Sequence, residues 1–491
     1  MHKSFSVNIA EAANSGAVLQ AGIARQEISN REDAVPIADP LYATVLALAQ
    51  GDTRALIIGM DVTAIGGRAI SDYMLPDVGE EFLPALRQKI ETELGLPGEH
   101  VLVNASHTHP PGRMLCSDEE QIERCFAAAK QALGQLQAVR VAAFSRKAAG
   151  ISMNRTLRLK DGQDWSIRHS IPSPPPKLVC GAGPLDDIVS GIRFERLDGS
   201  PLALLFNFAC HLLFGNYDGA LTANFPGLAA RRIEAGLGQG CMALFLQGAA
   251  GDVCDVEFKN FSKPRDIAGL ADKLAAAVLA EQAALRCKNA NLSLHSEEIM
   301  LPRRKDIPQR LQKLQQQQVE LLSSLRFCTL NFDEFWPLYQ ESLQAPANAD
   351  PEHMAMRSFN QKNIDRYIEC LRSMEQLSKI EDDMETLRKH AEISERAAGA
   401  PLAGDVMGLR IGDSLIITAP FEALAQISLD VKAWSAVPNT MMAAYSNGYM
   451  HYGAPASYYE RGGYEVCECQ LDAEWQQIYE NCVKKIIAKL S

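Results

Sequence analysis

The chain has 491 residues, of which 47% are hydrophobic and 22% are charged, which is the composition of an ordinary globular protein. Its 60 acidic and 48 basic residues give a formal net charge of -12, which argues against nucleic acid or an anionic membrane surface as the main partner. No apolar run reaches about 18 residues, so no membrane-spanning helix is expected. Residues 1–20 lack the apolar centre of a secretory signal, which favours a cytoplasmic location.

Residues 17–300 alternate short apolar runs with amphipathic stretches, the pattern of an α/β domain. The apolar runs at 41–48 and 54–61 flank a Gln-Gly-Asp turn and predict a β-hairpin. Further strands are predicted over 101–104, 139–144, 192–196, 202–208 and 242–246, and helices over 79–95, 118–136, 226–237 and 265–285. The pattern predicts a mixed β-sheet core flanked by helices.

Residues 303–398 differ from the rest because glutamine and charged residues dominate and apolar residues recur every three or four positions. This predicts a long helical, coiled-coil-like insertion in a single domain made of residues 1–302 and 399–491. The polar gap at 344–351 allows two helical arms to fold back on each other as a hairpin. Alternatively, the arms dock on another subunit and form a homo-oligomer.

After the insertion, the chain is predicted to return to the sheet. Residues 406–411 and 414–419 read as two strands around a Gly-Asp turn. A helix is predicted from Phe421 onward, and a last helix over 472–490. Twelve cysteines are scattered along the chain without a C-x-x-C pair, so neither a disulfide framework nor a zinc ribbon is expected.

His107 and His109 follow the end of a predicted strand, where loops commonly carry function. On extended backbone the two rings point to the same side, but a loop can splay them so that one binds a metal and the other faces a substrate. Taken alone, the pair is a weak signal. It is equally typical of two polar residues in a turn before Pro110 and Pro111.

Five segments, in order along the chain, resemble the motifs of neutral, non-lysosomal ceramidases. Residues 104–112, Asn-Ala-Ser-His-Thr-His-Pro-Pro-Gly, are similar to the family's T-H-T-H-S-G-P-G. The others are Asn-Phe-Ala-Cys-His at 207–211, Gln-Gly-Ala-Ala-Gly-Asp-Val-Cys at 247–254, Ala-Pro-Phe-Glu at 419–422 and a tyrosine-rich block at 445–465. The resemblance covers about residues 17–302 and 400–466. The C-terminal immunoglobulin-like domain of secreted ceramidases is not expected here.

The resemblance implies one zinc ion per chain, held by His107, His211, Glu422 and Tyr452. The residue types agree with this, because two neutral imidazoles and a carboxylate form a hydrolytic zinc site that leaves a position for water. A tyrosine ligand is reasonable because a dication lowers the pKa of a phenol as it does that of water. Taken singly, His211 would be a satisfied core histidine and Tyr452 a packed aromatic.

The resemblance also assigns His109, Arg155 and Tyr464 to stabilising the oxyanion that forms when zinc-bound water attacks an amide carbonyl. His109 is a candidate to protonate the leaving amine. Cys254 stands where the family has a serine. Its thiol could bind zinc, act as the nucleophile or line the pocket, and we favour the last, because attack by water needs no protein nucleophile.

The sequence thus predicts a zinc-dependent amidohydrolase that cleaves an N-acyl bond of a small-molecule, lipid-like or peptidyl substrate. Whether that substrate is ceramide is left open. A second hypothesis keeps the site but assigns it to biosynthesis, with amide hydrolysis, condensation or cyclisation on a natural-product or peptide intermediate. A third, from another class, is a non-catalytic scaffold whose helical arms bind a partner.

Overall fold

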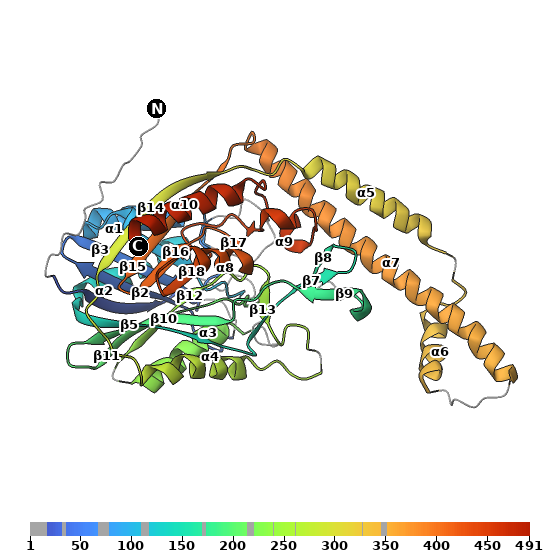
Figure 1. Cartoon of the computed structure of the whole chain (residues 1–491), viewed down its shortest axis with the longest axis horizontal. Coiled ribbons are helices and arrows are strands. Elements are labelled where there is room, and N and C mark those ends of the chain that lie inside the picture. Colours follow the sequence, from blue (N-terminus) through green and yellow to red (C-terminus); the bar gives the residue numbers. More distant parts are fainter. Residues whose placement is uncertain are drawn as a thin grey trace. The chain divides into compact units, whose positions relative to one another are not determined.

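The computed structural model describes residues 17–31, 36–66, 78–109, 117–168, 173–213, 220–238, 240–260, 262–326, 328–344 and 351–491. Pro110, Pro111 and the first 16 residues lie outside these ranges. The chain divides into two compact units (Figure 1). The first contains Met1–Ser166, Pro175–Arg303 and Gly399–Ser491, and the second Ile167–Pro174 and Arg304–Ala398.

An eight-stranded sheet in the order β12-β11-β10-β5-β1-β2-β3-β4 forms the centre of the first unit. Its strands are β1 (Gln20–Glu27), β2 (Tyr42–Gln50), β3 (Thr53–Met60), β4 (Val101–Ala105), β5 (Gln137–Lys147), β10 (Ile188–Arg196), β11 (Pro201–Phe208) and β12 (Met242–Gln247). β3 pairs with β4 and β11 with β12 in parallel, and the other neighbours are antiparallel. The prediction of a mixed sheet is confirmed, as is the hairpin of β2 and β3.

A four-stranded sheet packs against one face of the large sheet. Its strands, in spatial order, are β14 (Leu292–Leu301), β15 (Leu402–Ile411), β16 (Ser414–Thr418) and β18 (Asn439–Ala443). Side chains alternate between the two faces of each strand. In β2, Leu46 and Leu48 therefore pack toward the small sheet, whereas Val45 and Ala47 lie in the core under the helices. This alternation builds one apolar layer between the sheets and another beneath the helices.

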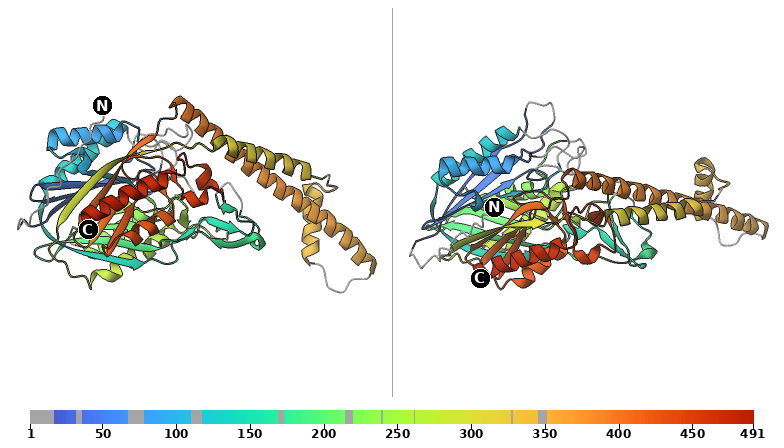
Figure 2. Two further views of the ribbon diagram at one scale, coloured as in Figure 1. Left: turned by 45° about the horizontal axis from the view of Figure 1, so that its top comes forward. Right: turned by 90° about the horizontal axis from the view of Figure 1, so that it is seen from above.

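Helices cover the outer faces of both sheets (Figure 2). On the large sheet, α1 (Phe82–Leu94) and α2 (Asp118–Gly134) lie over the β1–β4 half, and α3 (Asn224–Leu237) and α4 (Ile267–Gln282) over the β5 and β10–β12 half. On the small sheet lie α8 (Ala425–Trp434) and α10 (Trp475–Leu490). The unit is a layered α/β structure, as the sequence predicts. No helix among the described residues is long and apolar enough to cross a membrane.

The two edges of the large sheet meet. β1 and β5 pair over two residues at one end, so the two halves of the sheet are weakly joined there. The edge strands β4 and β12, which belong to different halves, contact each other. The backbone N–H of Gln247, at the end of β12, donates to Asn104 Oδ1 in β4 at 2.8 Å. The carboxyl ends of β4, β11 and β12 therefore lie together, and the loops that leave them converge on one region.

Short elements complete this region. They are β6 (Ser152–Asn154), β7 (Thr156–Leu159), β8 (Asp164–Ser166), β9 (Val179–Ala182), β13 (Val253–Asp255), β17 (Glu422–Ala423), β19 (Tyr452–Gly453) and α9 (Tyr464–Cys467). The helix predicted from Phe421 onward is wrong for its first residues, because Glu422 pairs in parallel with Tyr452 and α8 begins at Ala425. The pairing satisfies backbone groups, with Glu422 N–H donating to His451 O at 2.8 Å.

The second unit is helical, as predicted for the insertion. It consists of α5 (Ile307–Ser324), α6 (Phe332–Gln344) and α7 (Pro351–Arg396), and both α5 and α6 pack on α7. Gln318 bonds to Glu381 at 3.1 Å, and the Cys370 thiol lies 3.6 Å from Arg326 O, so α5 and α7 run antiparallel. The two arms therefore form a hairpin within one chain.

Candidate metal centre

His107 is fixed in the loop that follows β4. Its backbone takes a left-handed conformation, with φ 62°, which is uncommon for a residue other than glycine and marks functional sites. Its N–H donates to Val62 O at 2.9 Å, and its ring Nδ1 lies 2.7 Å from Thr63 O. Since a carbonyl oxygen can only accept, the proton of the ring lies on Nδ1. When the ring is neutral, this leaves a lone pair on Nε2 of His107.

His211 is fixed in the same way at the end of β11. Its N–H donates to Val253 O at 2.8 Å, and its Nδ1 lies 2.5 Å from Ala250 O. Ala250 belongs to the loop after β12, and Val253 is the first residue of β13. This hydrogen bond again leaves a lone pair on Nε2. A backbone carbonyl behind each imidazole is the partner that metal-binding histidines commonly have.

The Nε2 atoms of these two histidines and a carboxylate oxygen of Glu422 lie close together. The two Nε2 atoms are 3.0 Å apart, and Glu422 Oε2 lies 3.4 Å from that of His107 and 3.2 Å from that of His211. The three side chains are only 1 to 2% exposed. Three electron pairs thus face one another in a buried position, which a cation placed among them would stabilise.

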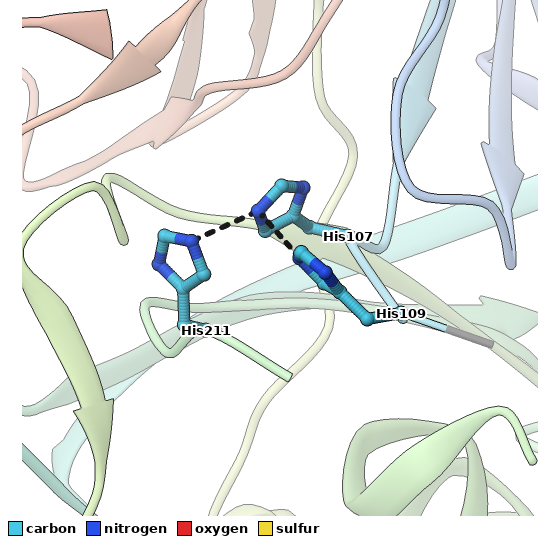
Figure 3. Close-up of side chains that lie close together, drawn as sticks. All are labelled: His107, His109 and His211. Carbon is cyan, nitrogen blue, oxygen red and sulfur yellow. Dashed lines mark hydrogen bonds between the residues drawn. The ribbon is translucent and has the colours of Figure 1, made fainter. Parts of the chain in front are cut away.

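His109 adds a third imidazole to this group. Its Nε2 lies 3.1 Å from that of His107, and the three rings turn toward a common centre (Figure 3). Together, His107, His109 and His211 have the spacing of a metal-binding group. The position predicted to face a substrate is therefore also within reach of the proposed ligands.

The protonation states suit metal binding. Burial lowers the pKa of His211 to about 4, assisted by the charge of Arg155 and by His107. Burial, assisted by His107 and His211, holds the pKa of His109 well below its usual range. Burial alone raises the pKa of Glu422, but His107 and His211 outweigh it and hold that pKa well below its ordinary value. At neutral pH, His109 and His211 are neutral and Glu422 is ionised, the forms in which these groups bind metals.

Two tyrosines not singled out from the sequence hold the carboxylate. Tyr449 donates its hydroxyl to Glu422 Oε1, and Tyr445 donates to Oε2 at 3.3 Å. Tyr445 has φ 54°, so its left-handed backbone turns its ring onto that of His107, with centroids 4.2 Å apart. Both residues lie in the tyrosine-rich block at 445–465. The tyrosine-rich block is the sequence feature that points to these residues, but it does not indicate which hydroxyl donates to which carboxylate oxygen.

Arg155 forms a second buried group beside the first. Its Nε donates to Glu465 at 2.8 Å, and one Nη donates to the Tyr452 hydroxyl at 2.9 Å and to Gly251 O at 2.8 Å. Glu465 also accepts from Thr156 and from a serine in β8. The pairing of β17 with β19 places Tyr452 next to Glu422, so Tyr452 stands between the two groups.

The two remaining predicted residues also lie here. The ring of Tyr464 is 5.5 Å from the Tyr452 ring and 5.5 Å from Arg155 Cζ. Cys254 is fully buried in β13, and its backbone bridges to that of His211. Burial raises the pKa of the Cys254 thiol to about 12, although Arg155 opposes this. A thiol of that pKa is protonated at neutral pH and is a poor nucleophile.

Asp252 holds these segments together. One carboxylate oxygen accepts from the N–H of Ala425, the first residue of α8, at 2.8 Å, and the other accepts from Asn154 at 2.7 Å. Its carbonyl accepts the Arg155 N–H at 2.8 Å. The loop after β12, the start of α8 and the arginine segment are thereby fixed to one another.

No model of a known protein family matches the sequence, and no curated protein matches it. Among solved structures, the chain is similar to neutral ceramidase from Pseudomonas aeruginosa, with a TM-score of 0.60 at 14% identity, over 96% of this chain and 74% of that one. It is also similar to a ceramidase complexed with C2, with a TM-score of 0.60 at 12% identity, over 96% and 75% of the two chains. The chain has the fold of the neutral ceramidases. At this identity, the likeness concerns the fold.

Proposed function

We propose that the protein is a zinc-dependent amidohydrolase that cleaves an N-acyl bond. The observation that carries the proposal is the meeting of His107 Nε2, His211 Nε2 and Glu422 Oε2 within 3.4 Å, each imidazole held from behind by a carbonyl. Neutral imidazoles and a carboxylate are the donors of hydrolytic zinc sites. The fold shared with ceramidases, which hydrolyse an amide, supports the same reaction class.

In this proposal one zinc ion per chain is held by His107, His211 and Glu422, with Tyr452 as the fourth ligand. When bound, zinc polarises a carbonyl and lowers the pKa of water to about 7, which supplies a nucleophile at neutral pH. His109 is assigned to the substrate side. Its Nε2 lies 3.1 Å from that of His107, so it is the competing candidate for the fourth ligand.

The arginine group supplies the charge that the reaction needs. A developing oxyanion is stabilised best by donors that are already oriented in a buried site. The guanidinium of Arg155 is fully buried and held by Glu465, and Tyr464 lies against it. We assign Arg155 and Tyr464 to the oxyanion. His109, neutral at pH 7, is assigned to accepting the proton that the attacking water loses and passing it to the leaving amine.

Cys254 is assigned to lining the site. A buried thiol with a pKa of about 12 does not supply a nucleophile at neutral pH. The substrate is proposed as an N-acyl compound, either lipid-like or a smaller acylated amine or peptide.

The test is turnover on a panel of N-acyl amines of increasing chain length, N-acyl sphingoid bases and acylated peptides, measured by release of the free amine. The protein is assayed as purified, after removal of metal by a chelator, and after addition of one equivalent of zinc. We expect turnover of at least one class, its loss on chelation and its return with zinc. A protein that binds zinc but is inert on every amide would contradict the proposed reaction and favour a scaffold.

A further inference from the structure

The side chain of Gln247 joins the two segments that carry His107 and His211. Its Nε2 donates to Ser106 O at 2.9 Å and to Cys210 O at 2.8 Å, and these are the residues directly before the two histidines. Its Oε1 accepts from Cys210 N at 3.2 Å and from its neighbour Gly248 N at 3.1 Å. Every donor and acceptor of this amide is used.

This contact is internal to the protein core. Gln247 is 0% exposed, so water does not compete for its hydrogen bonds. The two carbonyls that it joins belong to segments that are 104 residues apart in sequence and leave β4 and β11. β4 is an edge strand and β11 the second strand from the other edge of the large sheet, so the two strands do not pair with each other. Beyond their ends, an isolated parallel bridge joins Thr108 to Leu212, and the amide of Gln247 is a second direct link, placed before the two histidines.

A second amide extends the link. Asn104, in β4, accepts the backbone N–H of Gln247 at 2.8 Å and donates to Ala444 O at 2.6 Å and to Ser446 Oγ at 2.9 Å. Ala444 and Ser446 flank Tyr445, which bonds to Glu422. The buried amides of Gln247 and Asn104 thus connect three segments, which carry His107, His211 and the tyrosine that holds Glu422.

We infer that Gln247 is a positioning residue for the metal centre, which sets the separation of His107 and His211 without touching the metal. The inference rests on the proposed zinc site. Partners that orient ligands from behind commonly change metal affinity by about 10- to 100-fold when removed. The side chain acts on both histidines at once through the carbonyls of the preceding residues, so its loss affects the geometry of the site more than the stability of either strand.

Asn207 offers a matched control. It is also a buried amide at the end of β11, and its Nδ2 donates to Leu246 O and to Met442 O, each at 3.0 Å. It therefore ties strands together as Gln247 does, but its partners do not precede the histidines. Loss of Asn207 removes the same kind of buried hydrogen bond from the same sheet.

The experiment compares Gln247→Met with Asn207→Leu in the full chain, since each removes the amide and keeps roughly the size of the side chain. Zn²⁺ affinity is measured by competition with a chromophoric chelator, and the visible spectrum of the Co²⁺-loaded protein reports ligand geometry. Thermal unfolding of the metal-free proteins reports stability. Gln247→Glu, which keeps the oxygen acceptor but loses the amide donors, with Asn207→Asp as its control, carries the comparison if Gln247→Met does not fold.

We expect the Gln247 variants to bind Zn²⁺ about 10- to 100-fold more weakly and to shift the Co²⁺ spectrum. The Asn207 variants should lose stability with wild-type affinity and spectrum. Equal losses of affinity in both sets, or wild-type affinity and spectrum in the Gln247 variants, would overturn the positioning role alone. A wild-type protein that binds no Zn²⁺ would overturn the proposed function together with this inference.

Discussion

Two buried groups lie on either side of Tyr452, and their charges are balanced differently. They are the histidine group, which consists of His107, His211 and Glu422, and the arginine group, which consists of Arg155 and Glu465. In the arginine group, the buried cation has a buried anion at 2.8 Å. In the histidine group, two lone pairs and a carboxylate face one another. The charges of the arginine group balance each other, whereas a bound cation would stabilise the histidine group. We therefore expect changes in the arginine group to affect mainly stability, and changes in the histidine group to affect mainly metal binding and turnover.

The largest expected effect is on the histidine group. Glu422→Gln keeps the shape of the side chain but removes the charge that balances a cation. We expect loss of stoichiometric zinc and a fall in turnover of about 1,000-fold or more, because a metal contributes several kcal/mol to such reactions. Metal analysis and amide turnover measure the two effects. Glu465→Gln is the control, and zinc bound equally by both variants would contradict the assignment of Glu422.

In the arginine group, the main expected effect is on stability. Arg155→Met leaves Glu465 buried without its cation, which costs about 3–5 kcal/mol in the free energy of unfolding. Urea unfolding of the metal-free protein measures this. Zinc should still bind, while turnover falls about 100- to 1,000-fold through loss of the oxyanion donor.

The double variant Arg155→Met/Glu465→Met separates the two roles of the arginine. Removing both charges should restore much of the stability lost in Arg155→Met, because no unpaired ion is left in the core. Turnover should stay low. If turnover recovered along with stability, Arg155 would have only a structural role and would not stabilise the oxyanion.

Acid should destabilise the metal-free protein through the histidine group. The pKa of His211 is lowered from its ordinary 6.5 to about 4 in the folded state, so between these values the unfolded chain binds more protons. Stability therefore falls as pH drops from about 6.5 to about 4, by about 3 kcal/mol for this residue. Urea unfolding at a series of pH values measures it. His211→Gln should show a shallower dependence, and parallel curves would contradict the buried, neutral state of His211.

The smallest expected effect is at Cys254. Cys254→Ser replaces a protonated thiol with a hydroxyl at a fully buried position. We expect zinc binding and turnover to remain within about threefold of the wild type, since a lining residue contributes little to the barrier. Steady-state kinetics with metal analysis checks this. If turnover disappeared while zinc stayed bound, the thiol would be the nucleophile and attack by water would be wrong.

Much of the fold could be predicted from the sequence, because strands buried on both faces and amphipathic helices leave strong periodic signals. The hairpin of β2 and β3, the helical insertion and the mixed sheet follow from those patterns. The start of α8 did not. Glu422 and Ala423 have no strand signature of their own, and their pairing with residues 452–453 depends on a contact about 30 residues away along the chain.

The predicted site residues come from six segments of the chain, and the structure brings them into one region. The sequence could name the residue types but not the contacts that set their states. The ring nitrogen that carries the proton in His107 and in His211 is set by the backbone carbonyls of Thr63 and Ala250. Because every residue has a backbone carbonyl, the sequence does not indicate which ones bond to the two histidines. Gln247 was visible only as part of a loop motif. Its role depends on the meeting of two sheet edges, which periodicity does not predict.

The most direct test of the proposed zinc site is the metal content of the purified protein, measured by elemental analysis alongside that of Glu422→Gln and His107→Ala. We expect about one zinc ion per wild-type chain and a clear loss in both variants. Less than stoichiometric metal in the wild type after incubation with zinc, or a content unchanged by the two substitutions, would contradict it.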